Sequence, residues 1–295
     1  MYKNFEQLIG NQSEVAGRLV VAAAHDRCTL EAVFDAEREF GFKFILVGDR
    51  DKIISLSSEL GYTVGADVIV GAGDDEDCAG VAVGLIREGA GTGLMKGIIE
   101  TGVLLKAVLN KETGVRGSGV LSHLAILEAP GYHKLIGITD GGMIPCPTLD
   151  QKAHIAINAA EYFRSIGYVR PKIAAICASE SVSEKIQETV DAAELQKMSR
   201  KGYLGDCLLE GPLSFDIAVS SDSAAVKNFS SEISGNVDIL LMPNISVGNV
   251  LAKGLIYWAG AKMAGCILGA GIPIVLSSRG ASAEEKMLSI VMSMV

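Results

Sequence analysis

The stretch "RLVVAAAHDRCTLEAVFDAEREFGFKFILVG" (18–48) contains two short apolar runs on either side of a helix-like segment. The runs at 18–24 and 42–48 have the length and composition of buried strands, and residues 26–40 are typical of a helix. A strand, a helix and a second strand in this order predict parallel strands with the helix packed across them.

The same alternation continues along the chain. After a helix that ends near Leu60, we expect strands at 67–73, 122–129, 134–140, 172–177, 214–220, 237–243 and 265–278. We expect the remaining helices to start at Asp74 and to lie near 99–110, 150–166, 182–200, 246–262 and 283–295. This pattern predicts mostly parallel sheets flanked by helices. The turn-rich stretch "GGMIPCPTL" after Asp140 is the candidate crossing between two domains.

The composition limits the classes of partner. The chain has 295 residues, of which 49% are hydrophobic, and a formal net charge of -9. Such a charge disfavours broad attraction to nucleic acid or to an anionic membrane, so an anionic substrate would need a local basic pocket. The amino terminus does not resemble a signal peptide, and the apolar stretch 263–276 is broken by Gly and Pro. We therefore expect a soluble protein.

The cysteines favour a reducing compartment. The six cysteines are scattered, without a CxxC pair or a Cys/His cluster. We expect reduced thiols in a cytoplasmic protein and no structural metal site. No GxGxxG, GxxxxGK[ST], HExxH or GxSxG pattern occurs. The acidic run "DDED" (74–77) is typical of a helix start, with a metal site as a weaker alternative.

The stretch "PIVLSSRGASAEEKM" (273–287) joins a strand to the last helix and is the strongest candidate site. Ser278 and Arg279 follow the strand directly, and Gly280 would let the backbone approach a ligand. Free N–H groups at a helix start and an arginine fork both suit a phosphate. Ser282 and Glu285 also form the S-x-x-E pattern of a capping box, which would occupy the carboxylate of Glu285.

Three further segments combine glycine with a cation or an amide. Lys96 precedes Gly97, with Thr101 shortly after it, and Arg116 lies in the loop "GVRGSG". Asn249 and Lys253 are four residues apart and would share one helix face. Each could reach a phosphate at the end of a strand. The alternatives are a solvated lysine in a turn, a surface arginine and an exposed polar helix face.

Six segments together resemble the phosphate acetyl/butyryltransferase family over nearly the whole chain. They are "LMKGIIETGVLLKAVLNKETGVR" (94–116), "LSHLAIL" (121–127), "ITDGGMIPCPTLDQKAHIAINA" (138–159), "EGPLSFDIAVS" (210–220), "PNISVGNVLAKGLIYWAGA" (243–261) and "PIVLSSRGASAEEKM" (273–287). "GPLSFD" and the "SR…SAEEK" ending are more similar to the butyryl branch than to the acetyl branch.

The resemblance implies an acyltransferase that converts acyl-CoA and phosphate into acyl phosphate and CoA. It implies two α/β domains like those of isocitrate and isopropylmalate dehydrogenases, with the active site in the cleft between them. The expected domains are 1–138 with 277–295, and 139–276. The resemblance also implies a homodimer or a larger homo-oligomer. CoA and phosphate would be substrates, with no permanently bound cofactor and no metal.

The resemblance also assigns roles to residues. Arg279 would hold the phosphate and stabilise the oxyanion, and Ser278 would assist it. Glu285 would be the base for the CoA thiol, where the acetyl branch has an aspartate. The family-typical positions for binding phosphate or CoA are Lys96, Thr101, Arg116, Asn249, Lys253, Gly280 and Ser282.

Several functions compete with a butyryl-specific phosphate acyltransferase. The enzyme could prefer acetyl groups, since one methylene changes binding by only about 1–3 kcal/mol. The chain could also be a non-catalytic protein that binds CoA or acyl phosphate. A dehydrogenase of the same architecture would need a nucleotide loop and metal-binding aspartates, which the sequence lacks. A covalent route would use Cys146, which lies in a proline-flanked turn.

Overall fold

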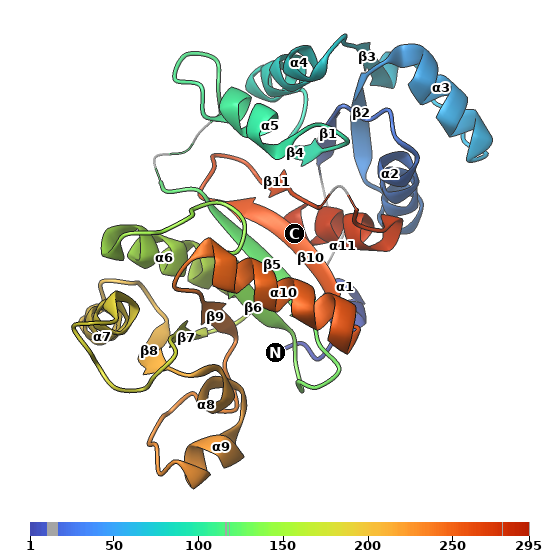
Figure 1. The fold of residues 1–295 in the computed structure, drawn as a ribbon. Helices are drawn as coiled ribbons and strands as arrows, with labels where there is room; N and C mark the ends of the chain where they lie inside the picture. Colours follow the sequence, from blue (N-terminus) through green and yellow to red (C-terminus); the bar gives the residue numbers. More distant parts are fainter. Residues whose placement is uncertain (11–16, 116, 118, 279, 295) are drawn as a thin grey trace. The chain divides into compact units, whose positions relative to one another are not determined.

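The computed structural model describes residues 1–10, 17–115, 117, 119–278 and 280–294. The chain divides into two compact units, each made from two segments. Unit 1 comprises Met1–Gly10 and Val120–Met263, and unit 2 comprises Asn11–Gly119 and Ala264–Val295. Figure 1 shows the order of the elements along the chain.

Unit 2 is built on the strand–helix–strand pattern of residues 18–48. Its strands run in the order β3 (Ile69–Gly71), β2 (Lys43–Gly48), β1 (Arg18–Ala22), β4 (Gly93–Lys96), β11 (Ile274–Val275) and β10 (Lys262–Leu268). All these neighbours pair in parallel except β10 with β11. Buried apolar side chains fill β1, β2 and β4, as expected for a sheet that is covered on both faces.

Three helices of unit 2 begin with an aspartate cap. The helices of unit 2 are listed here with their bounds. They are α2 (Arg27–Phe40), α3 (Arg50–Glu59), α4 (Asp75–Arg87), α5 (Thr101–Val108) and α11 (Ala283–Met294), with a short 3₁₀ turn at Ala66–Val68. Asp26 caps α2 and Asp74 caps α4, each accepting from the backbone N–H three residues later. The acidic run at 74–77 is therefore a helix start, as predicted. α11 packs against α2.

The strands of unit 1 also pair mostly in parallel. Its strands run in the order β5 (Ser122–Glu128), β6 (Ile136–Thr139), β9 (Ile239–Leu241), β7 (Lys172–Ile176) and β8 (Leu208–Leu213), and only β5 is antiparallel to its neighbour within the unit. The helices are α1 (Phe5–Gly10), α6 (Leu149–Ser165), α7 (Gln187–Arg200), α8 (Phe215–Val219), α9 (Ser221–Val226) and α10 (Ile245–Ala259). The sheet buries Leu127, Ile138 and Leu240 in one apolar cluster with Ile217 of α8.

Two sequence-based expectations differ from the structure. The strand expected at 214–220 is wrong, because β8 ends at Leu213 and residues 215–219 form α8. Pro212 lies within β8, which is the last strand at one edge of the sheet, and an edge strand tolerates a proline.

The units also differ from the expected domains 1–138 with 277–295 and 139–276. The chain passes between units at Gly10–Asn11, at Gly119–Val120 and at Met263–Ala264. β5 and β6 pair with each other and β6 pairs with β9, which places both in unit 1. β11 pairs with β4, which places it in unit 2.

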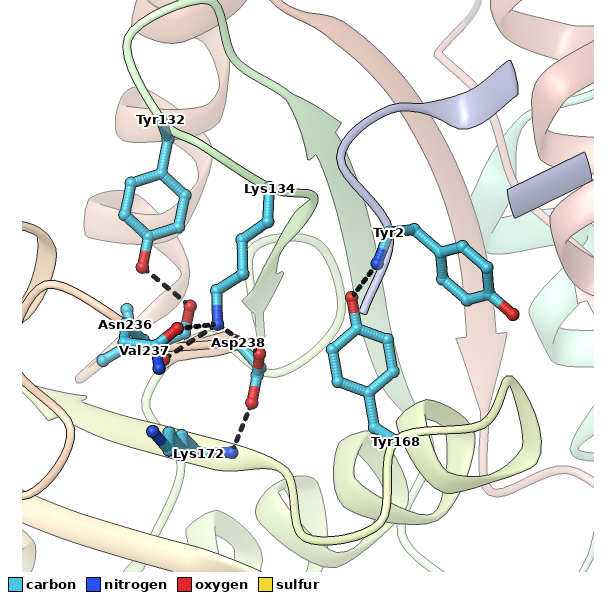
Figure 2. Close-up of polar contacts among 8 residues, drawn as sticks. All are labelled: Tyr2, Tyr132, Lys134, Tyr168, Lys172, Asn236, Val237 and Asp238. Atoms are coloured by element: carbon cyan, nitrogen blue, oxygen red, sulfur yellow. Dashed lines mark hydrogen bonds and ion pairs between the residues drawn. The ribbon is translucent and has the colours of Figure 1, made fainter. Parts of the chain in front are cut away.

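A buried ion pair holds the amino ends of the strands in unit 1 (Figure 2). The Lys134 Nζ donates to Asp238 Oδ1 at 2.6 Å, and the two side chains are 1% and 4% exposed. Lys134 also donates to the backbone and side-chain oxygens of Asn236, both at 2.8 Å. Burial lowers the pKa of Lys134, and the carboxylate of Asp238 opposes this shift. Burying this pair therefore costs free energy, and removing one of the two partners costs more.

We predict that Asp238→Asn lowers the free energy of unfolding by about 3–5 kcal/mol, because it leaves the buried ammonium without a carboxylate. The pKa of Lys134 would fall further, so the folded protein would bind fewer protons than the unfolded chain. The loss should therefore shrink as the pH rises from 7 towards the ordinary lysine pKa of about 10.4. Urea unfolding followed by circular dichroism at several pH values measures both effects.

The matched control is Lys197→Met, which removes the exposed pair between Lys197 and Glu194. We expect this change to cost less than about 1 kcal/mol at every pH. If Asp238→Asn costs no more than the control, the buried pair does not stabilise unit 1.

Candidate functional site

The start of α11 contains the capping box that the sequence predicts. The backbone N–H of Ser282 donates to Glu285 Oε2 at 2.9 Å, and the N–H of Glu285 donates to Ser282 Oγ at 3.2 Å. Ser282 is exposed and Glu285 is half-buried. The carboxylate of Glu285 is therefore held close to the first turn of α11, where the helix dipole favours a negative charge.

Two residues just before the capping box are exposed. Ser278 and Gly280 are both exposed, and the Gly280 N–H donates to Ser278 Oγ at 3.4 Å. Arg279, the residue to which the sequence assigns the phosphate, lies outside the described residues. Ser277 precedes this segment and is buried, and its hydroxyl has no hydrogen-bond partner in the described part of the chain.

Lys96 is buried, so the alternative of a solvated lysine in a turn is wrong. It is the last residue of β4 and is 1% exposed. Its ammonium donates to the carbonyls of Gly97 and Ile99 at 3.0 and 3.1 Å. A Cβ on Gly97 would lie 2.1 Å from the carbonyl oxygen of Ala23, so only glycine fits beside β1. Lys96 thus fixes the turn that follows β4.

The register of the sheet relates Lys96 to the start of α11. Val275 of β11 is paired with Met95 of β4, so the residues that follow both strands leave the same edge of the sheet. A second buried lysine, Lys286, lies in the first turn of α11 and was not singled out from the sequence. Its Nζ is 3.4 Å from the Thr29 hydroxyl in the first turn of α2. The two buried ammonium groups of Lys96 and Lys286 therefore lie near this edge of unit 2.

The other candidates of unit 2 are less informative. Thr101 is the first residue of α5 and is half-buried. Arg116 lies outside the described residues.

In unit 1, Asn249 and Lys253 both lie on α10 and both are exposed. The amide of Asn249 donates to the carbonyl of Gly141 at 3.3 Å. A Cβ on Gly248 would lie 2.8 Å from the Cα of Gly141, so the backbones of α10 and this loop are in close contact at Gly248. Asn249 therefore anchors the loop after β6, whereas Lys253 has no such contact among the described residues.

Asp140 organises the loop that Asn249 anchors, a role that sequence reasoning missed. Its Oδ1 accepts the N–H groups of Gly142 and Met143 at 2.7 and 2.9 Å, and its Oδ2 accepts that of Ile144 at 3.1 Å. An aspartate followed by two glycines signals such a turn, in which the side chain binds the backbone that follows. The sequence predicts a domain crossing for this stretch and includes it in the family resemblance, but does not predict the turn around Asp140.

His123 lies against the loop that Asp140 organises, and it was not identified from the sequence either. It stands near the start of β5, where its carbonyl accepts the Thr139 hydroxyl at 2.8 Å. Burial lowers the pKa of His123, and the nearby carboxylate of Asp140 acts in the opposite direction. A lone histidine in an apolar run gives no sequence signal of this kind, because the loop that covers it is remote in the chain.

Features of other site classes were also sought. Within the described ranges, no three His, Cys, Asp or Glu side chains converge as metal ligands would. No described helix combines the length and apolar character needed to cross a membrane. All six cysteines are free, and Cys146 is exposed.

Comparison with known proteins places the chain in a family. Residues 75–294 match the family described as Phosphate acetyl/butaryl transferase. The phosphate butyryltransferase of Clostridium acetobutylicum is 39% identical over 294 residues, which cover 99% of this chain and 98% of the relative. The phosphate acetyltransferase of Thermotoga maritima is 34% identical over 290 residues, which cover 98% of each chain.

A solved structure supports the same placement. The branched-chain phosphotransacylase of Enterococcus faecalis V583 is 32% identical, with a TM-score of 0.81, and the match covers 94% of this chain and 97% of that one. The resemblance predicted from the six sequence segments is therefore confirmed: the chain belongs to the phosphate acetyl/butyryltransferase family.

Proposed function

We propose that the protein is a phosphate acyltransferase that interconverts acyl-CoA and phosphate with acyl phosphate and CoA, and that it favours butyryl-CoA. The observation that carries the proposal is the start of α11, where the exposed residues Ser278, Gly280 and Ser282 and the fixed carboxylate of Glu285 lie in the same unit as the buried ammonium groups of Lys96 and Lys286. Preference for a C4 chain rests on relatives named phosphate butyryltransferase at 39% and 40% identity, against 34% for an acetyltransferase.

In the proposed reaction, the CoA thiolate attacks the acyl carbonyl of the acyl phosphate, and phosphate leaves. A thiol of ordinary pKa is mostly protonated at neutral pH, so a base that takes its proton increases the rate. Glu285 is proposed as that base. Its Oε2 is used by the cap, while the carboxylate retains a second oxygen to receive the proton.

Arg279 is proposed to bind the phosphate and to stabilise the negative charge that develops on the carbonyl oxygen, assisted by the Ser278 hydroxyl. The N–H groups at the start of α11 would add to the same anion site. The further proposed binding positions are Thr101, Arg116, Asn249, Lys253 and Gly280. Both substrates would bind together, in a cleft of the kind found in isocitrate and isopropylmalate dehydrogenases. No metal or permanently bound cofactor would take part.

A cytoplasmic location is part of the proposal. The six free thiols fit a reducing compartment. Assembly into a homodimer or a larger homo-oligomer is also proposed. It is supported by an apolar stripe on α10, formed by Val247, Val250, Tyr257 and Trp258, which is exposed in the single chain.

We predict that the protein releases CoA from butyryl-CoA only when phosphate is present, and that Arg279→Ala lowers kcat by about 10²–10³ without changing the melting temperature. Loss of one preorganised donor to an oxyanion has effects of this size. Free thiol is followed with acyl-CoA substrates from C2 to C8, including branched chains.

Failure to release CoA with every one of these substrates would contradict the proposed function. Near-normal turnover of Arg279→Ala would remove Arg279 from the reaction. Cys146→Ala provides the control for a covalent route. We expect it to keep normal turnover and sequential kinetics, whereas ping-pong kinetics would favour an acyl-cysteine.

The two roles of Glu285 can be separated with Glu285→Gln. A glutamine oxygen can accept the same N–H in a capping box, so the melting temperature should change little. It cannot take a proton from the thiol, so kcat should fall at least about 10²-fold, the lower range for general acid–base catalysis.

Ser282→Ala is the matched change for the cap alone. We expect it to lower the free energy of unfolding by about 1 kcal/mol. Because the backbone N–H that holds Glu285 remains, any loss of kcat should be smaller than that of Glu285→Gln. If Glu285→Gln has normal kcat, Glu285 is only a cap.

Trp258, the one tryptophan in the sequence, is 93% exposed and reports on the α10 stripe. We expect Trp258→Glu to shift the protein towards the monomer in sedimentation equilibrium, since a buried apolar contact would gain a charge. The control Val226→Glu alters another exposed apolar residue, at the end of α9, and should leave the mass unchanged. A wild-type protein that is monomeric at all concentrations would contradict the assembly.

A further inference from the structure

Nδ1 of the His123 imidazole is buried. Among the described residues neither ring nitrogen has a hydrogen-bond partner. The side chain as a whole remains partly exposed. A polar atom buried without a partner is rare and needs a reason, because it loses its hydrogen bonds to water.

The loop after β6 buries Nδ1. A Cβ on Gly142 would lie 3.1 Å from Nδ1 and 3.0 Å from Cγ, so the backbone of Gly142 lies flat on this side of the ring. Asp140 holds that backbone with three hydrogen bonds, and Asn249 anchors Gly141. The position of the ring is therefore fixed by several contacts that do not use its nitrogens.

This arrangement selects one tautomer. If Nδ1 carried the proton, a buried N–H donor would lack a partner, which costs about 1–3 kcal/mol. With the proton on Nε2, only a lone pair is unsatisfied at Nδ1, and buried acceptors tolerate this better than donors. Burial also disfavours the charged ring. His123 thus presents an uncharged Nε2–H donor.

The Nε2–H donor of His123 lies at the end of the sheet where ligands bind in open α/β folds. Leu124 of β5 is opposite Thr139, the last residue of β6, so His123 is at the carboxyl end of that parallel strand. In open α/β sheets, ligands bind beyond the carboxyl ends of the strands. An uncharged donor matches an uncharged acceptor, whereas phosphate oxygens are better matched by lysine and arginine.

We propose that His123 Nε2–H donates a hydrogen bond to a carbonyl oxygen of the acyl-CoA substrate, with the Asp140–Ile144 loop as the device that fixes its tautomer. The assignment rests on the proposed acyltransferase function. An acyl-CoA offers two sources of such an oxygen, which are the thioester carbonyl and the amide carbonyls of its pantetheine arm.

The test compares three variants. The amide nitrogen of His123→Gln can reach the place of Nε2, whereas that of His123→Asn reaches only the place of Nδ1. We expect His123→Leu and His123→Asn to lower kcat/KM for butyryl-CoA at least about tenfold, and His123→Gln to restore most of the loss. The control is His133→Asn, since His133 is exposed and its ring contacts Tyr132.

The kinetic constants identify the oxygen. A fall in kcat with little change in KM would assign the thioester carbonyl, because that oxygen gains charge in the transition state. A rise in KM for both CoA and acyl-CoA with normal kcat would assign a pantetheine amide. Wild-type kinetics in His123→Leu would overturn the proposal, and so would equal losses in His123→Gln and His123→Leu with a lowered melting temperature.

Two measurements do not depend on turnover. Nitrogen-15 NMR of the free enzyme should show the proton on Nε2, and a proton on Nδ1 would overturn the assignment. If the wild-type protein proves inactive, calorimetric binding of butyryl-CoA separates the two proposals. An inactive wild-type protein would contradict the proposed function. Weaker binding of butyryl-CoA by His123→Leu would still support the contact with His123, whereas unchanged binding would overturn that contact.

Discussion

The buried pair of Lys134 and Asp238 connects three neighbouring strands of unit 1 at their amino ends. The backbone of Asp238 accepts from Gly137 of β6 and donates to Lys172 of β7, both at 2.8 Å, and its Oδ2 accepts the N–H of Lys172 at 2.8 Å. One residue thus aligns β6, β9 and β7. A slip of one residue would turn every side chain to the other face of the sheet, so this alignment also decides which residues leave the carboxyl ends.

Different contacts hold the loops at the carboxyl ends of the strands. Here the close contacts are between backbones, at Gly97 beside Ala23 in unit 2 and at Gly141 beside Gly248 in unit 1. Without a Cβ in the way, the loops lie close to the sheet and their polar groups are held by single side chains. Lys96 binds two carbonyls of its loop, and Asp140 binds three N–H groups of the other. A charged side chain at each loop thus keeps the backbone in a defined shape.

The elements that were predicted from the sequence are those that local interactions determine. The alternation of strands and helices follows from short apolar runs, and the capping box of Ser282 and Glu285 from four consecutive residues. Unit boundaries could not be read in this way, because β11 belongs to unit 2 only through its pairing with β4.

In the candidate site, too, the features that could be predicted are those that local interactions determine. The position of Ser278 and Ser282 at the start of α11 follows from the sequence. The burial of Lys96, in contrast, depends on β1. The covering of His123 depends on a loop that lies 17 to 21 residues further along the chain. Its helix face and the family resemblance predict that Asn249 binds the substrate, and its bond to Gly141 adds a structural role that only the fold could show.

A capping residue and a catalytic base are usually considered to be competing roles for one carboxylate, yet at Glu285 they can support each other. A free glutamate has three rotatable bonds, and fixing them during the reaction would cost conformational entropy. The capping box fixes them when the protein folds, through Oε2 and the Ser282 N–H. The carboxylate then stays in one place relative to Ser278 and the first turn of α11, as catalysis by a positioned group requires. On this view, the cap is what would make a residue as flexible as glutamate usable as the base.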